Sequence, residues 1–183
     1  MNLRQLHRLD AALGDLVRSV VGQAPGAVAI TRHTTDLGSM FMVTAAAVGL
    51  RRFGHRRSAA EVLVAGSLAW VIAHYAKTIV DRPRPYEAEQ VRRLIPPPTG
   101  SSMPSGHAAV VSAVTTVLAS HSRPGERWGW PLVTAWVPTT RIFLGVHYPA
   151  DTVAGAALGH GLGRAVAGVS ARLPVGPPDE APA

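Results

Sequence analysis

The chain contains no cysteine among its 183 residues, and this absence removes several classes of protein. Disulfide frameworks, thiolate nucleophiles and cysteine-ligated metal centres are all excluded. Charged side chains are also scarce, at 16% against roughly 25% in ordinary soluble domains. Lys77 is the only lysine, and the other basic residues are arginines. Because the chain otherwise uses arginine, its single lysine suggests that position 77 needs a lysine specifically.

The net charge of +7 raises the question of a nucleic-acid partner. The basic residues fall in short clusters between apolar segments, and they do not follow one stripe or one helix face. A nucleic-acid footprint is a continuous basic patch or stripe. We therefore expect no nucleic-acid partner.

Apolar residues make up 47% of the chain and gather in successive segments. The segments cover about residues 36–50, 58–77, 105–121, 129–146 and 150–170. Several are shorter than the roughly 20 residues of a simple membrane span, so their polar ends must be buried against neighbouring helices. Five such runs in succession favour a membrane protein over the alternative, a soluble helical core. We expect an all-α integral membrane bundle with five to six transmembrane helices.

Residues 3–21 carry leucines at helical spacing on one side and charged residues on the other, which is typical of an amphipathic helix. They lack the short apolar core and cleavage site of a signal peptide. Whether this helix lies in the membrane interface or packs against the bundle stays open. We expect a membrane phosphatase domain over residues 1–172, with the amphipathic helix at 1–22, and a disordered proline-rich tail at 173–183.

Arginine-rich loops predict the orientation in the membrane. Residues 51–57 (RRFGHRR) join the first two apolar segments, and residues 122–128 (SRPGERW) join the third and fourth. The positive-inside rule places both loops in the cytoplasm. Residues 78–104 and 147–149 then share the opposite face. We expect a multi-pass protein of the plasma membrane whose polar clusters face the extracytoplasmic side.

Glycines recur every four residues in the last segment, at Gly155, Gly159 and Gly163. Small residues at this spacing allow two helix backbones to approach closely in lipid. The pattern predicts tight packing of this segment against a neighbouring helix.

Three polar clusters fall on the predicted extracytoplasmic face. KTIVDRPRP supplies Lys77 and Arg84, and TRIFLGVHYPAD supplies Arg141. Arginine binds phosphate oxygens through two parallel hydrogen bonds, and lysine adds a compact point charge. In PSGH, Ser105 and Gly106 begin a helix, where free N–H groups and the positive end of the helix dipole attract an anion. This inventory predicts a phosphate site.

Two histidines accompany these cations. His147 and Asp151 are four residues apart across a predicted helix start, so the carboxylate can hold one imidazole nitrogen and leave the other free. With His107, they allow nucleophilic and acid–base work to be shared. A zinc site formed by the same three residues is the alternative. The surrounding cations argue against it, so we expect no metal.

The three motifs together resemble the signature of the type 2 phosphatidic acid phosphatase superfamily. That signature is a lysine, six residues and Arg-Pro, then Pro-Ser-Gly-His, then Ser-Arg, five residues, His, three residues and Asp. The chain matches all three in order between residues 77 and 151. It departs only at Thr140, which replaces the family serine and keeps the hydroxyl group.

The resemblance implies roles for the matching residues. His147 would attack phosphorus and form a phosphohistidine, and Asp151 would orient it. His107 would protonate the leaving oxygen and then activate water. The phosphoryl oxygens would be bound by Lys77, Arg84, Ser105, Gly106 and Arg141. The family needs no metal or other cofactor.

Other polar residues near the motifs are interpreted as structural. His74, one turn before Lys77, is expected to pack against its helix, with a place in the site as the alternative. His160 is expected as a packed or hydrogen-bonded core histidine. The charged residues of the long loop are expected to lie on a solvated loop helix, with contact to a substrate head group as the alternative; they are Arg82, Glu87, Glu89, Arg92 and Arg93.

We therefore expect a membrane phosphatase that acts on a lipid phosphate or diphosphate, such as phosphatidate, phosphatidylglycerophosphate or a polyprenyl phosphate. The alternatives are a phosphatase or phosphotransferase for a small soluble ester and a non-catalytic membrane phosphate-binding protein. The intact histidine pair and the aspartate argue against the last of these. The sequence specifies neither the lipid nor the oligomeric state.

Overall fold

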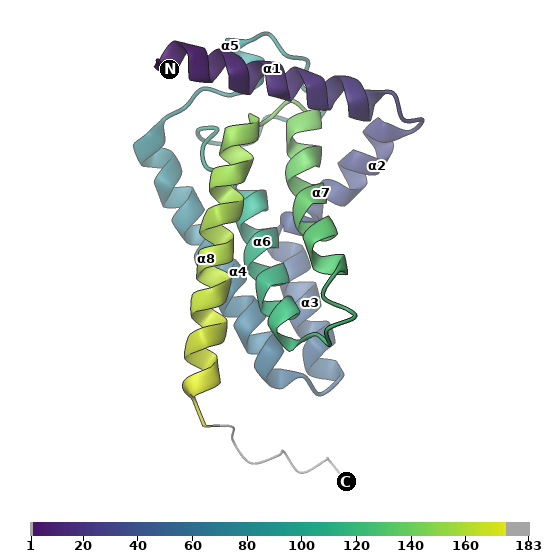
Figure 1. Ribbon diagram of the computed structural model, residues 1–183, viewed down its shortest axis with the longest axis vertical. Coiled ribbons are helices and arrows are strands. Elements are labelled where there is room, and N and C mark those ends of the chain that lie inside the picture. The colour runs from purple at the N-terminus through teal and green to yellow at the C-terminus, as the bar shows by residue number, and fades with distance from the viewer. Residues whose placement is uncertain (1, 175–183) are drawn as a thin grey trace.

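The computed structural model describes residues 2–174, which form helices and connecting loops without a strand (Figure 1). The elements are α1 (Leu3–Gly22), α2 (Ala27–Thr34), the 3₁₀ helix η1 (Thr35–Gly38), α3 (Met40–Arg52), α4 (Arg56–Val80), α5 (Pro85–Ala88), α6 (Gly106–His121), α7 (Gly129–Phe143) and α8 (Pro149–Arg172). The all-α prediction is confirmed, and each predicted apolar segment forms a helix. The short elements α2 and η1 were not predicted, whereas α5 lies in the long loop for which a loop helix was expected. Of the predicted disordered tail, residues 175–183 lie outside the described part of the chain.

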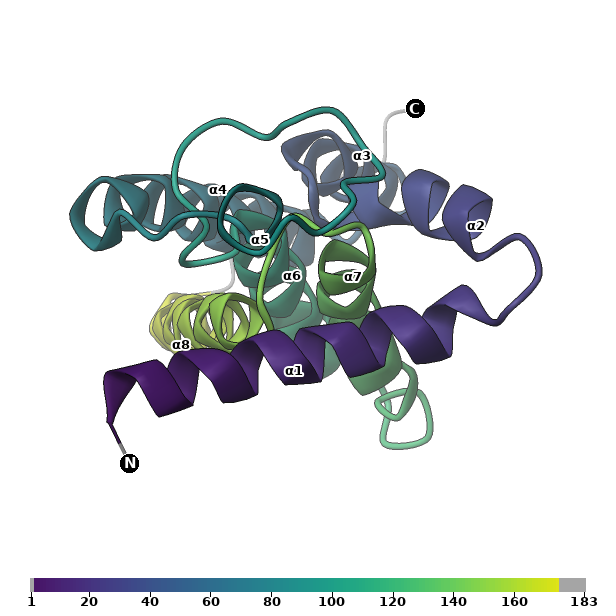
Figure 2. The ribbon, with the colours of Figure 1, turned by 90° about the horizontal axis from the view of Figure 1, so that it is seen from above.

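Five helices, α3, α4, α6, α7 and α8, run side by side along the long axis of the molecule (Figure 1). Helix α1 lies across one end of this bundle, over α7 and α8 (Figure 2). It packs through the side that carries Asp10 and Gly14, which are both buried, and Asp10 accepts a hydrogen bond from the backbone N–H of Ala150. Its apolar stripe stays exposed, as Leu9 and Leu16 show at 51% and 58%. Packing of α1 against the bundle, left open by the sequence, is thus observed.

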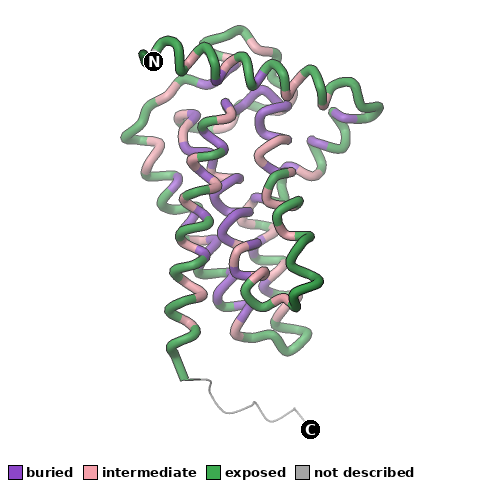
Figure 3. The backbone as a smooth tube through the Cα atoms, viewed as in Figure 1, coloured by how far each residue is buried: buried purple, intermediate pink, exposed green. Residues whose placement is uncertain are grey.

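The core between α3, α4 and α6 consists of alanine and valine side chains, and many of the large apolar residues point outward. Ala65, Ala69 and Ala113 are fully buried, whereas Phe41 and Ile79 are 77% and 83% exposed. Figure 3 shows the buried stretches on the facing sides of the helices and the exposed stretches outside. Soluble proteins most often bury their large apolar residues, and helices in lipid use small residues to approach closely. The distribution therefore suits a bundle surrounded by lipid.

Hydropathy alone identifies fewer spans than the sequence analysis predicts. Among the described residues, one helical stretch, Arg56–Ala88, is long and apolar enough by itself to cross a membrane. The other helices are shorter or less apolar by this measure. The number of five to six spans stays a prediction.

The glycines of α8 lie against the backbone of α6, as their spacing predicts. A Cβ atom at Gly155, Gly159 or Gly163 would collide with the carbonyl oxygen of Ser105, Ala109 or Ala113, in that order. The predicted close packing is confirmed. Because Ser105 begins α6, this contact fixes the start of α6 against the first turns of α8.

Candidate active site

The three predicted clusters meet at the end of the bundle that α1 covers. Lys77 lies in the last turn of α4, Ser105 is the N-cap of α6, and Asp151 lies in the first turn of α8. The N–H of Ser105 donates to the carbonyl oxygen of Asp151 at 2.9 Å, which joins the second cluster to the third. Arg84 Nη1 lies 3.5 Å from His147 Nε2, which joins the first cluster to the third.

Asp151 is fully buried and is held from several sides. Its Oδ2 accepts hydrogen bonds from the N–H of Tyr148 at 2.8 Å and from the hydroxyl of Ser102. Its Oδ1 accepts one from Nη1 of Arg82 at 2.7 Å. The predicted partner, His147, places Nδ1 3.6 Å from Oδ2, which is slightly longer than a hydrogen bond. The structure therefore brings the predicted pair together, at a distance a few tenths of an ångström longer than a hydrogen bond.

His147 lies in the turn between α7 and α8 and is 2% exposed. Burial lowers the pKa of its imidazole from the ordinary value of 6.5 to about 3; the hydrogen-bonding influence of Asp151 opposes this shift, and Arg141, Arg84 and Lys77 add to it. The ring is consequently neutral at neutral pH. With Asp151 beside Nδ1 and an arginine donor beside Nε2, the tautomer inferred from these partners carries its proton on Nδ1. Nε2 then has the free lone pair that a nucleophile needs.

Arg84 is 1% exposed, and its guanidinium group is saturated by carbonyl oxygens. Nε donates to Gly100, Nη1 to Val146, and Nη2 to Thr99 and Ser101, over distances of 2.8–3.2 Å. Arg84 therefore lies beside His147, the predicted nucleophile, and it also shapes the loop before α6. A phosphate oxygen would have to share these donors.

Two other predicted phosphate ligands keep unpartnered polar atoms. Arg141 is 3% exposed and donates from Nη1 to the hydroxyl of Thr35 at 3.0 Å, while its Nε has no partner. The hydroxyl of Ser105 is fully buried and also has none. A buried polar group without a partner costs about 1–3 kcal/mol. A bound anion would recover that cost, so these atoms support the predicted phosphate site.

Lys77 and His107 complete the predicted set. Nζ of Lys77 donates to the carbonyl oxygen of Ser101 at 2.6 Å. The side chain of His107 is 30% exposed, and its Nε2 lies 3.9 Å from a carboxylate oxygen of Asp36. Gly106 is the first residue of α6, and a Cβ there would meet no atom within 4 Å. Space for a ligand is therefore available above the start of α6.

Several residues at this end were missed by the sequence analysis. Thr35 and Asp36 belong to the unpredicted η1, in a stretch with no apolar periodicity. The prediction of a solvated Arg82 is wrong, because its guanidinium bonds Asp151 and Asp10, each at 2.7 Å. Its partners are distant in sequence, so no local pattern could have identified them.

The predictions for the other charged residues of the long loop and for two histidines are confirmed only in part. Glu87 is not simply solvated, because its carboxylate accepts from the N–H of Arg84 at 2.8 Å. Glu89 pairs with His7 at 2.8 Å on the exposed surface. His74 stacks on Trp70 of its own helix, as a packing role predicts, although it is exposed. The core position predicted for His160 is wrong, because the residue is exposed, but the predicted hydrogen bond is present, to Thr116.

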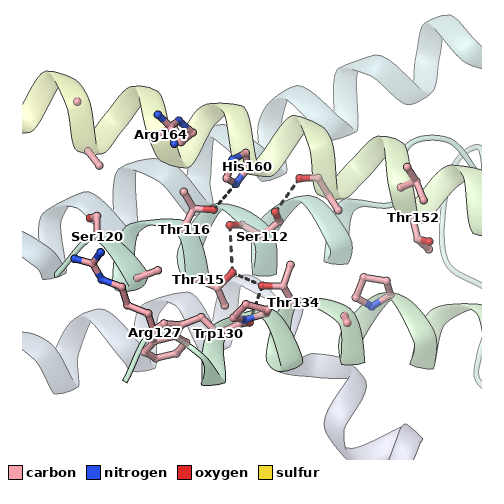
Figure 4. Close-up of a pocket in the computed structure, with 18 residues that line it drawn as sticks. Ser112, Thr115, Thr116, Ser120, Arg127, Trp130, Thr134, Thr152, His160 and Arg164 are labelled. Carbon is pink, nitrogen blue, oxygen red and sulfur yellow. Dashed lines mark hydrogen bonds between the residues drawn. The ribbon is translucent and has the colours of Figure 1, made fainter. Parts of the chain in front are cut away.

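Two cavities border this region. A polar cavity of about 680 Å³ opens beside Arg141. Its lining includes Arg32, His33, Thr35, Asp36 and Arg93. A larger and more apolar cavity of about 830 Å³ lies between α6, α7 and α8, from Thr152 near the site to Arg127 and Arg164 near the other end (Figure 4).

Comparisons with known proteins agree on one family. The model of the PAP2 superfamily matches residues 58–173. The undecaprenyl-diphosphatase BcrC of Bacillus subtilis is 36% identical over 106 residues, which are 55% of this chain and 53% of that protein. The match thus spans about half the length of that relative. The decaprenylphosphoryl-5-phosphoribose phosphatase of Mycobacterium tuberculosis is 33% identical over 170 residues, 87% of this chain and 89% of that protein.

Solved structures show the same fold. The crystal structure of Aquifex aeolicus LpxE superposes with a TM-score of 0.77 at 26% identity, over 85% of this chain and 92% of that one. The transmembrane PAP2-type phosphatidylglycerolphosphate phosphatase of Bacillus subtilis gives a TM-score of 0.74 over 93% and 88% of the two chains. At 20% identity, the second similarity concerns the fold alone.

Proposed function

Because this chain belongs to the PAP2 superfamily, we propose that it is a membrane phosphatase that hydrolyses a lipid phosphate or diphosphate through a phosphohistidine at His147. One observation carries the proposal. A buried neutral imidazole lies between a carboxylate 3.6 Å from Nδ1 and an arginine 3.5 Å from Nε2, beside buried donors that have no partner. This geometry favours attack by Nε2 on an anionic phosphorus group.

The reaction proceeds in two steps. In the first, the Nε2 lone pair of His147 forms a bond to phosphorus while the bond from phosphorus to the leaving oxygen breaks. His107 gives a proton to that oxygen, and Asp151 accepts a hydrogen bond from Nδ1–H of His147 as the ring gains positive charge. In the second, His107 removes a proton from water, the water oxygen bonds to phosphorus, and the P–N bond breaks to release phosphate.

Positive charge from the protein stabilises the transition states. Lys77, Arg84 and Arg141 all act electrostatically on both His107 and His147. Fixed cations and donors at the developing negative charge take over the part that metal ions play in many phosphoryl-transfer sites. We therefore propose a metal-independent mechanism.

The substrate class we favour is a polyprenyl phosphate or diphosphate. The two relatives named above carry undecaprenyl and decaprenylphosphoryl substrates in their names. The polar cavity beside Arg141 provides room and basic side chains for head-group atoms next to the phosphate that reacts. Phosphatidate, phosphatidylglycerophosphate and a small soluble ester are the alternative substrates, and the assay described below includes them.

We further propose a multi-pass protein of the plasma membrane with its site on the extracytoplasmic face. The arginine-rich loop 51–57 lies at the end of the bundle opposite α1 (Figure 1), and α1 would rest on the outer surface with its exposed leucines toward lipid. Single cysteines at His55 and Thr99 test this orientation, because the native chain has none. Labelling by an impermeant reagent from outside is expected at position 99 only, and the reverse pattern would contradict the orientation.

The function itself is tested by phosphate release from purified protein in detergent. The panel contains a polyprenyl diphosphate, a polyprenyl-phosphoryl sugar phosphate, phosphatidate, phosphatidylglycerophosphate and a soluble aryl phosphate, each assayed with the His147→Ala variant as control. We expect release from a polyprenyl substrate by the parent protein only. Release from the aryl phosphate alone would favour the soluble-ester alternative, and no release from any substrate would favour the non-catalytic one.

A further inference from the structure

Arg82 joins two carboxylates that come from distant parts of the chain. Its Nη1 donates to Oδ1 of Asp151 and its Nη2 donates to Oδ2 of Asp10, both at 2.7 Å. The three side chains are 17%, 0% and 11% exposed, for Arg82, Asp151 and Asp10 respectively. Charged hydrogen bonds of this length between largely buried groups are strong and directional.

The same bridge holds the turn that carries the nucleophile. The guanidinium carbon of Arg82 lies 4.1 Å from the centre of the Tyr148 ring, within the range of a cation–π contact. The second oxygen of Asp10 accepts the backbone N–H of Ala150 at 2.8 Å. Residues 148–151 are therefore fixed by α1 and by the loop after α4, as well as by their own helix.

The bridge also determines how the Asp151 carboxylate is rotated. Oδ2 faces Nδ1 of His147 and is held by Ser102 and the N–H of Tyr148. Oδ1 accepts the hydrogen bond from Arg82. Loss of the arginine would leave a buried carboxylate short of a charged partner and free to turn. His147 would then lose the fixed acceptor for its Nδ1–H.

We propose that Arg82 is a positioning residue for the catalytic pair Asp151–His147, and that Asp10 on α1 holds Arg82 in place. Helix α1 then contributes to catalysis by orienting Asp151 through Arg82. The inference rests on the proposed function, because it concerns the orientation of the histidine that forms the phosphoenzyme. It assigns Arg82 no contact with the substrate. The competing explanation is that the bridge only fastens α1 to the bundle.

The test compares Arg82→Gln, Arg82→Lys and Asp10→Asn with two matched controls. Asp15→Asn changes an aspartate of α1 that pairs with Arg18 on the exposed side of the helix, where Asp15 is 73% exposed. Arg123→Gln changes an exposed arginine of the α6–α7 loop, at the opposite end of the bundle. Removal of outer groups that orient a reacting side chain commonly slows turnover by about 10- to 100-fold.

We expect kcat to fall by about 100-fold in Arg82→Gln and by about 10-fold in Asp10→Asn, with KM nearly unchanged. Arg82→Lys should recover part of the loss, because a cation then remains beside Asp151. The double variant Asp10→Asn/Arg82→Gln should resemble Arg82→Gln alone, since the two residues act through one bridge. Both controls should retain parental turnover.

Two inhibitors separate orientation from damage to the site. Inorganic phosphate needs only the cationic cradle, so its inhibition constant should stay within a few-fold in every variant. Vanadate mimics the five-coordinate phosphorus and bonds to the attacking nitrogen, so its inhibition constant should rise in parallel with the loss of kcat. A merely structural bridge would weaken both inhibitors together, or neither, and either result would overturn the inference.

The outcome for the parent protein keeps the two proposals distinguishable. If the parent forms no phosphoenzyme and releases no phosphate, the proposed function fails. If the parent is active and Arg82→Gln behaves like Arg123→Gln, the function stands and the positioning role of Arg82 is refuted.

Discussion

The bundle buries a carboxylate at each end, and each carboxylate lies beside an arginine and a histidine. At one end, Glu61 on α4 accepts from Nε of Arg57 at 3.2 Å and lies 2.6 Å from Nε2 of His121. At the other, Asp151 accepts from Arg82 at 2.7 Å and lies 3.6 Å from His147. The residue types are nearly the same, so the difference in function has to come from how completely the groups are satisfied.

At the Glu61 end the polar groups have partners. Both carboxylate oxygens are engaged, and Arg57 also donates to the hydroxyl and the carbonyl oxygen of Ser170. At the Asp151 end, which α1 covers, buried side-chain atoms of several residues have no hydrogen-bond partner within the described chain; they belong to Arg18, Ser105, Arg141, His147 and Tyr148. Proteins seldom leave buried polar atoms unpaired without a reason. We interpret the Glu61 cluster as structural and the Asp151 cluster as a ligand-binding site.

The largest expected effect comes from removing each histidine in turn. His147→Ala should lower turnover by a factor of about 10⁴ or more, because the covalent route is lost. His121→Ala should keep turnover within a few-fold of the parent. Labelled aryl phosphate followed by an alkaline quench reports the phosphohistidine, which survives base. Label on the His147→Ala variant, or on another residue of the parent, would contradict the assignment.

The second histidine of the site should behave differently from the first. His107→Ala should slow turnover of a lipid phosphate by about 10²- to 10⁴-fold, the usual contribution of general acid–base catalysis. An aryl phosphate with a good leaving group needs no acid, so it should restore formation of the phosphoenzyme. Hydrolysis still lacks its base, and label should accumulate. Failure of the activated substrate to label this variant would argue that His107 does not act as the acid.

The two carboxylates should separate activity from stability. Asp151→Asn should reduce kcat by about 100-fold or more, since a neutral amide cannot stabilise the charged imidazole. Glu61→Gln should leave kcat near the parental value and lower the free energy of unfolding by about 1–3 kcal/mol, through loss of charge-assisted hydrogen bonds. Kinetic constants and thermal inactivation midpoints of both variants check this. A large loss of kcat in Glu61→Gln would contradict a purely structural role for the Glu61 cluster.

The sequence predicted those parts of the molecule in which the determining residues recur at short, regular spacing. His147 and Asp151 are four apart, and the glycines of α8 repeat every four residues, so helical geometry was enough. The chemistry of the basic cluster indicated Lys77 and Arg84, and the resemblance of the three motifs assigned both to the phosphoryl oxygens. The Arg82 bridge spans 69 residues to Asp151 and 72 to Asp10. Such pairings depend on how the helices pack, and no local pattern encodes them.

The short elements were missed for a related reason. The stretch TRHTTDLG contains few apolar residues, so neither a helical nor an alternating period appears. Its Thr35 nevertheless becomes buried because it forms a hydrogen bond with Thr140 at 3.0 Å and accepts from Arg141. Here the tertiary partner determines the role of the residue.

Gly155, Gly159 and Gly163 form a glycine seam between α6 and α8 that runs from the site toward the other end of the bundle. Substitutions along this seam should affect activity to different extents. Gly155→Ala would push against Ser105 at the site, and Gly163→Ala against Ala113 and Thr116 farther along the seam. Both should lower the free energy of unfolding by about 1–3 kcal/mol, the usual cost of overpacking. Only Gly155→Ala should also reduce kcat in the fraction that remains folded. Gly161→Ala, which meets nothing within 4 Å, is the matched control.

The smallest expected effect is the response to a chelator. The Asp151 end brings Lys77, Arg84 and Arg141 to the two histidines, and a divalent cation placed among them would meet strong repulsion. Since these side chains already supply the charge that phosphoryl transfer requires, turnover in excess chelator should equal turnover without it. The protein is assayed after prolonged incubation with the chelator, and again after a divalent ion is restored. If activity is lost on chelation and recovers when the ion is restored, Lys77, Arg84 and Arg141 do not supply the charge that the reacting phosphate needs. The difference between the two ends would then need another explanation.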